Sequence, residues 1–158
     1  MYRFKIVSMF DIPKMLDVAD ILYQCGKDMA NKYDLHHWDN SKLKSLVVAE
    51  YCSLKNIVYL VYEDDAPVAT FQVSIKDMIL HFEKLATSPK ASGKGVGTLC
   101  MKAIEKIAQK NNCKKVVMEV YELSKHARDF YYHRGYEQTG MTDTLKYKEI
   151  KMEKRLSV

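Results

Sequence analysis

Three glycines on alternate positions make one stretch of this chain well suited to binding a phosphate. Gly93, Gly95 and Gly97 follow Pro89, which ends a strand because proline has no N–H to give to a ladder. Glycines let the backbone bend sharply and approach a ligand without a Cβ atom in the way. After Thr98 the apolar residues recur with helical spacing. A helix that begins at such a turn presents free N–H groups and a positive dipole end, so the stretch predicts a phosphate site.

The spacing of these glycines separates the stretch from two common phosphate-binding loops. A Walker A loop needs a lysine directly after its last glycine, and here Thr98 follows Gly97. A dinucleotide-binding fingerprint needs the spacing G-x-G-x-x-G, whereas these glycines alternate. A purely structural glycine-rich turn is the alternative for this window taken by itself.

The same window resembles the pyrophosphate loop of the GNAT superfamily of N-acetyltransferases, which runs (Q/R)-x-x-G-x-(G/A). The window extends from Ser92 to Gly97, and Pro89 lies six residues before Gly95, as the family's proline lies before its glycine. Ser92 departs from the Gln or Arg that the family usually has. Backbone N–H groups supply most of the grip on the pyrophosphate, so this departure weakens the resemblance only slightly.

A second stretch resembles another signature of the same family, A-x-x-(F/Y)-Y-x-x-x-G-(F/Y). The matching residues are Ala127, Phe130, Tyr131, Gly135 and Tyr136. The family often has Asn three residues before the alanine, where this chain has Ser124, an allowed but shorter helix N-cap. Two motifs in the right order identify the chain as a member of the family. The resemblance is good from about residue 57 to the C-terminus and loose over the first fifty residues.

The resemblance implies both a fold and an activity. The fold is α/β (α+β), a single GNAT-like domain over residues 1–158 with a mixed, mostly antiparallel sheet of about six to seven strands flanked by helices. The activity is the transfer of an acetyl group from acetyl-CoA to a primary amine of a small molecule or a protein. The alternative is a non-catalytic acyl-CoA-binding sensor on the same fold.

The resemblance also implies where acetyl-CoA, the co-substrate, would bind. Its pantetheine arm would pair with backbone groups of Leu85, Ala86 and Thr87, with a β-bulge opening the sheet and a backbone N–H as oxyanion donor. The other positions that it implies are Ser92, Gly93, Lys94, Gly95, Val96, Gly97 and Thr98 at the pyrophosphate, and Ser124, Ala127, Phe130 and Tyr131 in the second motif.

Tyr131 is the strongest candidate for a catalytic acid. A phenol with a pKa of about 10 can protonate a departing thiolate, whose ordinary pKa is about 8.5. The family places this tyrosine beside the sulfur, and Tyr132 would point to the other side of the helix. The alternative is a tyrosine that only packs its ring on the cofactor.

His81 and Glu83 are the candidates for a general base. An alkyl amine is mostly charged at neutral pH, so a carboxylate or an imidazole must remove its proton, directly or through water. Both residues precede the loop on one strand, and strict alternation would put them on the same face as Leu85 and Thr87. Each is also acceptable as a solvated strand residue, and an enzyme without a fixed base is a further alternative.

The acceptor is expected to bind where aromatic and polar residues cluster between two predicted helices. Tyr33 and Trp38 are the candidate substrate-binding residues, because the family varies this segment with the substrate. For Trp38 a core or hinge anchor is the alternative. His36 and His37 are adjacent and lack a partner motif, so we expect no metal site.

Composition is that of an ordinary globular domain of 158 residues with a net charge of +5. The net positive charge favours an anionic cofactor. Because the lysines are spread along the chain rather than clustered, we expect no nucleic acid as a partner. We find no apolar run that could span a membrane, no secretory signal and no paired cysteine spacing, and so expect a cytoplasmic enzyme with reduced thiols. A monomer and a homodimer both stay open.

The elements that must position these residues follow from local patterns. Alternating or β-branched runs predict strands at residues 2–6, 57–62, 68–74, 78–87, 116–121, 138–142 and 145–156. Asp11 and Ser41 are expected to cap two helices on the N-terminal side. Between Gly26 and Asn40 the helical pattern breaks up, which predicts an irregular segment there.

Overall fold

The structure is a computed structural model that describes residues 1–157. Within these residues one sheet of seven strands carries four α-helices and a short 3-10 helix, in agreement with the predicted fold class. The strands are β1 (Tyr2–Val7), β2 (Ile57–Glu63), β3 (Ala66–Lys76), β4 (Ile79–Thr87), β5 (Lys115–Tyr121), β6 (Glu137–Asp143) and β7 (Lys148–Arg155). The helices are α1 (Ile12–Tyr33), α2 (Lys42–Ser53), η1 (Pro89–Ala91), α3 (Val96–Lys110) and α4 (Lys125–Tyr132).

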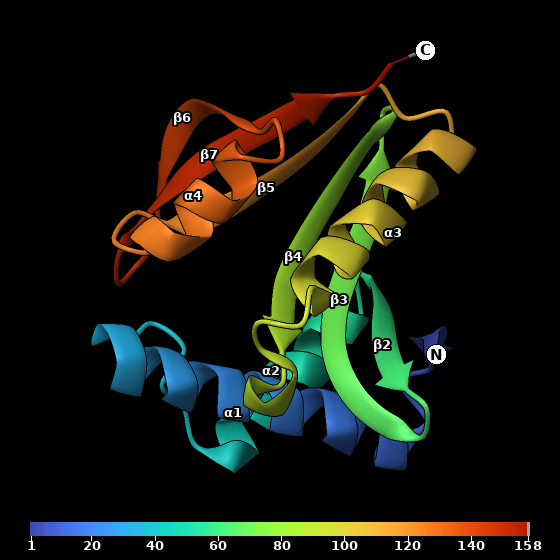
Figure 1. Cartoon of the computed structure of the whole chain (residues 1–158), viewed down its shortest axis with the longest axis vertical. Helices are drawn as coiled ribbons and strands as arrows, with labels where there is room; N and C mark the ends of the chain where they lie inside the picture. Colours follow the sequence, from blue (N-terminus) through green and yellow to red (C-terminus); the bar gives the residue numbers. More distant parts are fainter. Residues whose placement is uncertain (158) are drawn as a thin grey trace.

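The sheet is split in its middle. Its order is β1-β2-β3-β4-β5-β7-β6, and all neighbours are antiparallel except β4 and β5, which run parallel. These two strands pair only from Ile79 to His81 and from Lys115 to Val117. Beyond these residues they diverge, so that the two halves of the sheet form a V (Figure 1).

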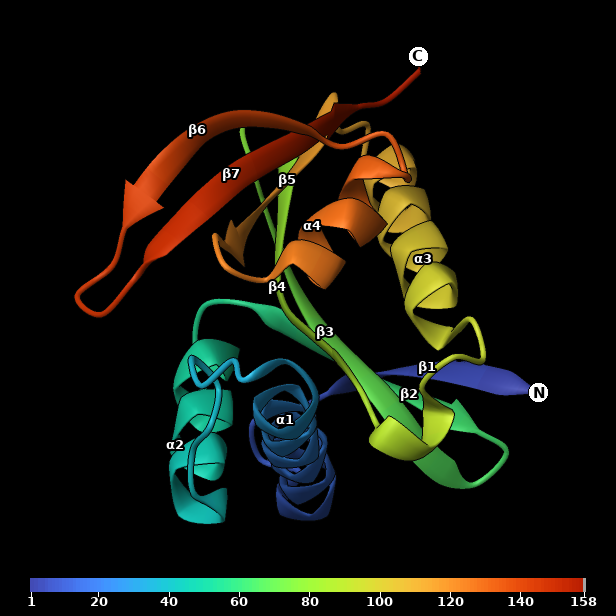
Figure 2. The ribbon, with the colours of Figure 1, turned by 60° about the vertical axis from the view of Figure 1, so that its left-hand side comes forward.

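The helices lie on both faces of the sheet and bury two separate cores. Figure 2 shows α1 and α2 together on one side of the β1–β4 half, with α3 and α4 on the other side. Alternation along β2 feeds both cores, since Val58 and Leu60 pack toward α1 and α2 while Val61 packs toward α3. The core on the α3 side includes residues from both halves of the sheet, whereas the core under α1 and α2 belongs to the β1–β4 half.

The first helix is longer than its sequence pattern predicts. Asp11 caps it as expected, because its carboxylate accepts a hydrogen bond of 3.2 Å from the Lys14 N–H. The predicted break at Gly26 is wrong, since α1 continues to Tyr33. The Trp38 backbone crosses the helix at Gly26, which explains why this helical position holds a glycine. A Cβ atom there would lie 2.0 Å from the Trp38 carbonyl oxygen.

The other boundaries agree with the sequence except near the C-terminus. Ser41 caps α2, and its Oγ accepts a hydrogen bond of 3.1 Å from the Lys44 N–H. The last strand begins at Lys148 rather than at Leu145, because Thr144 closes a turn through its N–H and Oγ1, which donate to the Tyr147 carbonyl oxygen. None of the helices within residues 1–157 is long and apolar enough to cross a membrane.

Candidate active site

A β-bulge in β4 lies at the point where the sheet divides. Thr70 pairs with Ala86 and Gln72 pairs with Glu83, so two steps along β3 match three steps along β4. The extra residue is accommodated at Lys84, which has a φ of 56°. This is the bulge that the sequence predicts, and it ends the regular alternation of the strand.

Because of the bulge, the side chains of β4 do not all lie on the face that strict alternation predicts. His81 and Glu83 do share one face, and Ala86 joins them there, packed against the α1 and α2 core. Leu85 packs against the α3 core instead, and Thr87 falls on that same opposite face. Strict alternation fails because one added residue reverses every side chain that follows it.

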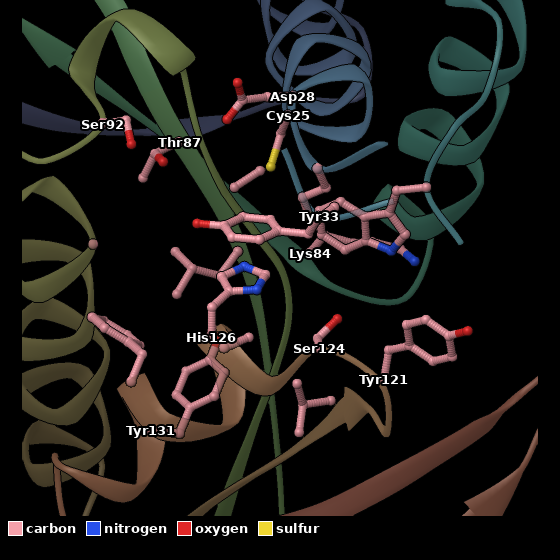
Figure 3. A pocket seen from close by; sticks show the side chains of 18 of the residues that line it. Cys25, Asp28, Tyr33, Lys84, Thr87, Ser92, Tyr121, Ser124, His126 and Tyr131 are labelled. Atoms are coloured by element: carbon pink, nitrogen blue, oxygen red, sulfur yellow. The ribbon is translucent and has the colours of Figure 1, made fainter. Parts of the chain in front are cut away.

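A cavity of about 530 Å³ fills the space between β4 and β5 (Figure 3). All the residues predicted for the site line it, except His81 and Lys94. The lining comes from the end of β4, the glycine loop, the first turn of α3, the C-terminal half of α1, the end of β5, and α4. Residues far apart in sequence thus meet in one place.

The glycine loop and the start of α3 form the side of this cavity that the sequence predicts to bind phosphate. Gly93 and Gly95 have φ values of 78° and 80°, a region that glycine adopts without strain. A Cβ atom on either one would meet nothing within 4 Å, so the backbone is open to a ligand. The first hydrogen bond within α3 joins the Leu99 N–H to the Gly95 carbonyl, which leaves the N–H groups of the first turn free.

Arg134 adds a permanent positive charge to this side and was missed by sequence reasoning. Its Nη1 donates a hydrogen bond of 3.2 Å to Thr98 Oγ1, and its guanidinium carbon lies 5.4 Å from the centre of the Phe130 ring. Arg134 occupies an unspecified position of the second motif, so the motif gives no sign of its role. The contact suits an anionic group at the start of α3.

Tyr131 lies on the inner face of α4, against the cavity. Its side chain is 8% exposed and its ring contacts those of Phe82, Phe130 and Tyr136. Burial raises the pKa of Tyr131 above its ordinary value, so the hydroxyl keeps its proton at neutral pH. Tyr132 is 67% exposed and points away, as the helical pattern predicts.

Ser124 stands at the N-terminus of α4, where its carbonyl accepts from the Arg128 N–H at 3.0 Å. Its side chain makes no capping hydrogen bond, contrary to what a serine N-cap suggests. The Oγ is buried, lacks a partner among the described residues, and belongs to a residue that lines the cavity (Figure 3). A ligand in the cavity would supply the missing partner.

His81 forms an ion pair with a residue of the other half of the sheet. Its Nε2 lies 2.7 Å from a carboxylate oxygen of Glu119 on β5, and its Nδ1 lies 3.9 Å from Glu83. The hydrogen bond raises the pKa of His81 and lowers that of Glu119. Sequence reasoning missed Glu119, although an acid within the apolar run 116–121 was a usable signal.

Aromatic side chains line the end of the cavity between α1, β5 and α4, where the sequence predicts that the acceptor binds. The Tyr33 ring at the end of α1 stacks on His126 of α4, with ring centres 4.1 Å apart, and Figure 3 shows the pair across the cavity. His37 lies 4.3 Å from Tyr121, ring centre to ring centre. Trp38 is half-buried in the same wall, and its ring centre is 5.6 Å from Lys84 Nζ.

The two adjacent histidines have different surroundings. Burial lowers the pKa of His37 to about 4, so its ring is neutral. His36 is exposed and bonds the carboxylates of Asp34 and Asp39, which raise its pKa. Within residues 1–157 no group of three or more side chains is placed to hold a metal ion.

Two further cavity residues carry shifted ionisations. Burial raises the pKa of Glu149, and the nearby carboxylates of Glu119 and Glu83 add to the rise. Burial also raises the pKa of Cys25 to about 11, so this thiol is protonated and a poor nucleophile. Sequence reasoning singled out neither residue, because both enter the cavity from elements whose local pattern is ordinary.

An open sheet with a glycine loop at its division is the framework of an acyltransferase family. Residues 17–136 match the model of the acetyltransferase (GNAT) family. The chain belongs to the GNAT acetyltransferases. None of the curated protein sequences matches it significantly.

Several solved structures share this fold over the whole chain. One is the PaiA N-acetyltransferase from Thermoplasma acidophilum in complex with coenzyme A (20% identity, 99% of each chain covered, TM-score 0.70). Another is the ribosomal-protein-S18-alanine N-acetyltransferase from Escherichia coli (13%, 100% and 96%, 0.72). A third is an acetyltransferase of the GNAT family from Staphylococcus aureus (10%, 99% and 100%, 0.74). At these identities the likeness establishes the fold.

Proposed function

We propose that this protein is an acetyl-CoA-dependent N-acetyltransferase that acetylates a primary amine. One observation carries the proposal: the free N-terminus of α3, the unpaired edge of β4, Tyr131 and Glu83 all meet in one cavity. The similar structure with bound coenzyme A supports the same cofactor class. The cytoplasm stays the proposed compartment.

The donor would be held by backbone groups. After His81, the edge of β4 that faces β5 has no strand partner within the described residues, so its N–H and C=O groups are available to an amide-bearing arm. The bulge at Lys84 turns this edge into the cavity. A backbone N–H between Leu85 and Thr87 would stabilise the developing oxyanion, and the start of α3 with Arg134 would hold the phosphates.

The side chains would manage two protons. The amine nitrogen forms a bond to the acetyl carbon while the carbon–sulfur bond breaks. Glu83 takes a proton from the nitrogen, directly or through a water molecule, and the Tyr131 hydroxyl gives a proton to the departing sulfur. Geometry favours Glu83 over His81 as the base, because Glu83 lines the cavity whereas His81 is already paired with Glu119.

The acceptor would enter past the aromatic wall. Tyr33 and Trp38 line that end of the cavity together with Glu119 and Glu149. Aromatic faces and carboxylates both attract an ammonium group before it loses its proton. This arrangement supports an amine as the acceptor and not an alcohol or a thiol.

A panel of primary amines tests the proposal. Each amine is mixed with acetyl-CoA and the protein, and release of the free thiol is followed with time. We expect amine-dependent release from at least one class of small molecule or peptide amine. Tight binding of acetyl-CoA with no release for any amine would instead support the sensor and contradict the proposal.

A further inference from the structure

Asn56, in the turn between α2 and β2, contacts the proposed base. Its side-chain Nδ2 donates one hydrogen bond of 3.0 Å to Glu83 Oε1 and another of 3.0 Å to Gln72 Oε1. The backbone N–H of Asn56 donates to the Cys52 carbonyl at 3.1 Å, which ties the residue to the last turn of α2. Asn56 therefore joins three elements: its backbone N–H contacts α2, and its side-chain amide contacts β3 and β4.

The orientation of this amide follows from its two partners. Both Gln72 Oε1 and the Glu83 carboxylate accept hydrogen bonds, so the NH₂ group of Asn56 must face them. The opposite orientation would place its carbonyl oxygen against two other oxygens. Gln72 is fully buried on β3, next to Glu83 on β4, so the amide is anchored to a buried side chain.

The other oxygen of Glu83 lies near the imidazole of His81. Its Oε2 lies 3.9 Å from His81 Nδ1, and His81 is held on its far side by Glu119 at 2.7 Å. One carboxylate oxygen is thus fixed by an amide and the other lies near an imidazole. The hydrogen bond from Asn56 is therefore the direct side-chain contact that orients this carboxylate, with the imidazole farther away.

Several charged or titratable groups share this environment. They are Cys52 and Lys55 at the end of α2, His81 and Lys84 on β4, Glu119 on β5, and Glu149 and Lys151 on β7. Asn56 lies near these groups but is itself neutral, and its side chain donates directly to Glu83. Replacing it changes the hydrogen bond without removing an existing charge.

We propose that Asn56 is a positioning residue for acetyl transfer: its amide holds the Glu83 carboxylate in the orientation that accepts the proton of the amine. The inference rests on the proposed function, since it assigns the partner of the base in that reaction. It also gives α2 a part in catalysis, because the last turn of this helix fixes the amide.

Two substitutions at Asn56 test the inference, with Asn31→Asp on the exposed surface of α1 as the matched control. Asn56→Ala removes the donor, and Asn56→Asp keeps the size but sets a carboxylate against Glu83. We expect kcat to fall on the order of 10-fold to 100-fold while the KM for acetyl-CoA is unchanged, because a misplaced group slows chemistry and not donor binding. The acidic limb of the kcat profile should move to higher pH, further for Asp than for Ala.

The pH profile and the stability of the two variants separate catalysis from folding. A purely structural role would lower the melting temperature and the acetyl-CoA affinity together with kcat, without moving the acidic limb, and that result would overturn the inference. Melting temperature and acetyl-CoA affinity are measured on the same samples to identify any unfolded variant.

Nuclear magnetic resonance supplies a readout that needs no turnover. The Asn56 side-chain amide signal should titrate with pH in the wild-type protein, and the titration should vanish in Glu83→Gln. An amide that does not titrate would show that the contact is wrong. If the amide titrates but no amine is acetylated, the proposed function fails, and the role of Asn56 in catalysis fails with it although the contact stands.

Discussion

Tyr131 lines the cavity and carries a proton at neutral pH, as an ordinary phenol does. Burial raises its pKa further, which keeps the hydroxyl protonated but makes it a weaker acid. Its ring packs between Phe82, Phe130 and Tyr136, which fixes the direction of the hydroxyl. The same packing would also explain a purely structural tyrosine, so the hydroxyl must be tested separately from the ring.

Tyr131→Phe keeps the ring and removes the hydroxyl. We expect kcat to fall by about 10²–10⁴-fold, the usual contribution of general acid catalysis, while coenzyme A binding persists. The loss should shrink with acyl donors whose thiolate leaves more readily, because these need less help from a proton. A variant with near-normal kcat, measured where chemistry limits the rate, would remove Tyr131 from the mechanism.

Trp38 belongs to both the cavity wall and a core. It lines the acceptor end of the cavity and packs against the cluster under α1 and α2. We expect Trp38→Ala to raise the KM for the amine roughly 10-fold, about 1.4 kcal/mol, with little change in the KM for acetyl-CoA. Steady-state kinetics against each substrate measures the two effects, and an equal rise in both would support the core anchor.

At the scale of single residues, the sequence reaches the side chains that belong to motifs. Tyr131 and the loop glycines were predicted because their spacing within one segment carries the signal. Glu119, Asn56 and Arg134 were not predicted, since their roles depend on contacts with residues 38, 27 and 36 positions away in the chain. Such contacts are created by the topology of the sheet; the sequence marks Glu119 only as an acid within an apolar run, and it does not identify the partner of any of the three residues.

The glycine loop is the element of the cavity that we propose binds the phosphates of the cofactor. Gly95 begins α3 with a φ of 80°, and a Cβ atom there would meet only open space. In the proposed function, the phosphates approach the backbone through this space. We therefore expect a side chain added here to obstruct the ligand according to its bulk and negative charge, and to disturb the fold less.

Gly95→Glu places bulk and negative charge in that space. We expect saturating acetyl-CoA to stabilise the wild-type protein by about 2.7 kcal/mol at a hundred times Kd, a rise in melting temperature of roughly 5–10 °C. The variant should lose this rise, whereas Gly95→Asn, which tolerates a positive φ, should keep much of it. A folded Gly95→Glu protein that still binds coenzyme A normally would show that the loop assignment is wrong.

Gly26 in α1 lets the Trp38 backbone pack closely against the helix. We expect Gly26→Ala to destabilise the protein by about 1–3 kcal/mol, because its Cβ would lie 2.0 Å from the Trp38 carbonyl oxygen. Thermal unfolding measures the loss. Gly97→Ala is the matched control, since its Cβ would lie 3.5 Å from Phe130, and an equal effect in both variants would contradict the proposed steric cause.

At the scale of elements, regular patterns were read correctly and irregular ones were not. Capping by Asp11 and Ser41 follows from local chemistry and was predicted. The face of Leu85 and Thr87 was predicted wrongly, because a bulge changes alternation without changing composition. Gly26 was predicted to break the helix because glycine is unfavourable within one. The structure explains this glycine by the Trp38 backbone, which crosses the helix at that position.

At the scale of the whole molecule, the division between β4 and β5 creates the site. The two strands pair over only three residues each and then separate, although one buried core still includes residues from both halves of the sheet. An edge that would pair with a strand in a closed sheet is instead free to bind an extended ligand. The fold class was predictable from the two motifs, whereas the shape of the cavity required the structure.

The direct test of the account follows the acetyl group itself. The protein is incubated with isotopically labelled acetyl-CoA and the most active amine of the panel, and the products are analysed by mass spectrometry. We predict that the label appears on the amine nitrogen, in amounts equal to the thiol released, and that Gly95→Glu abolishes its transfer. Bound acetyl-CoA with no label on any amine would contradict the account.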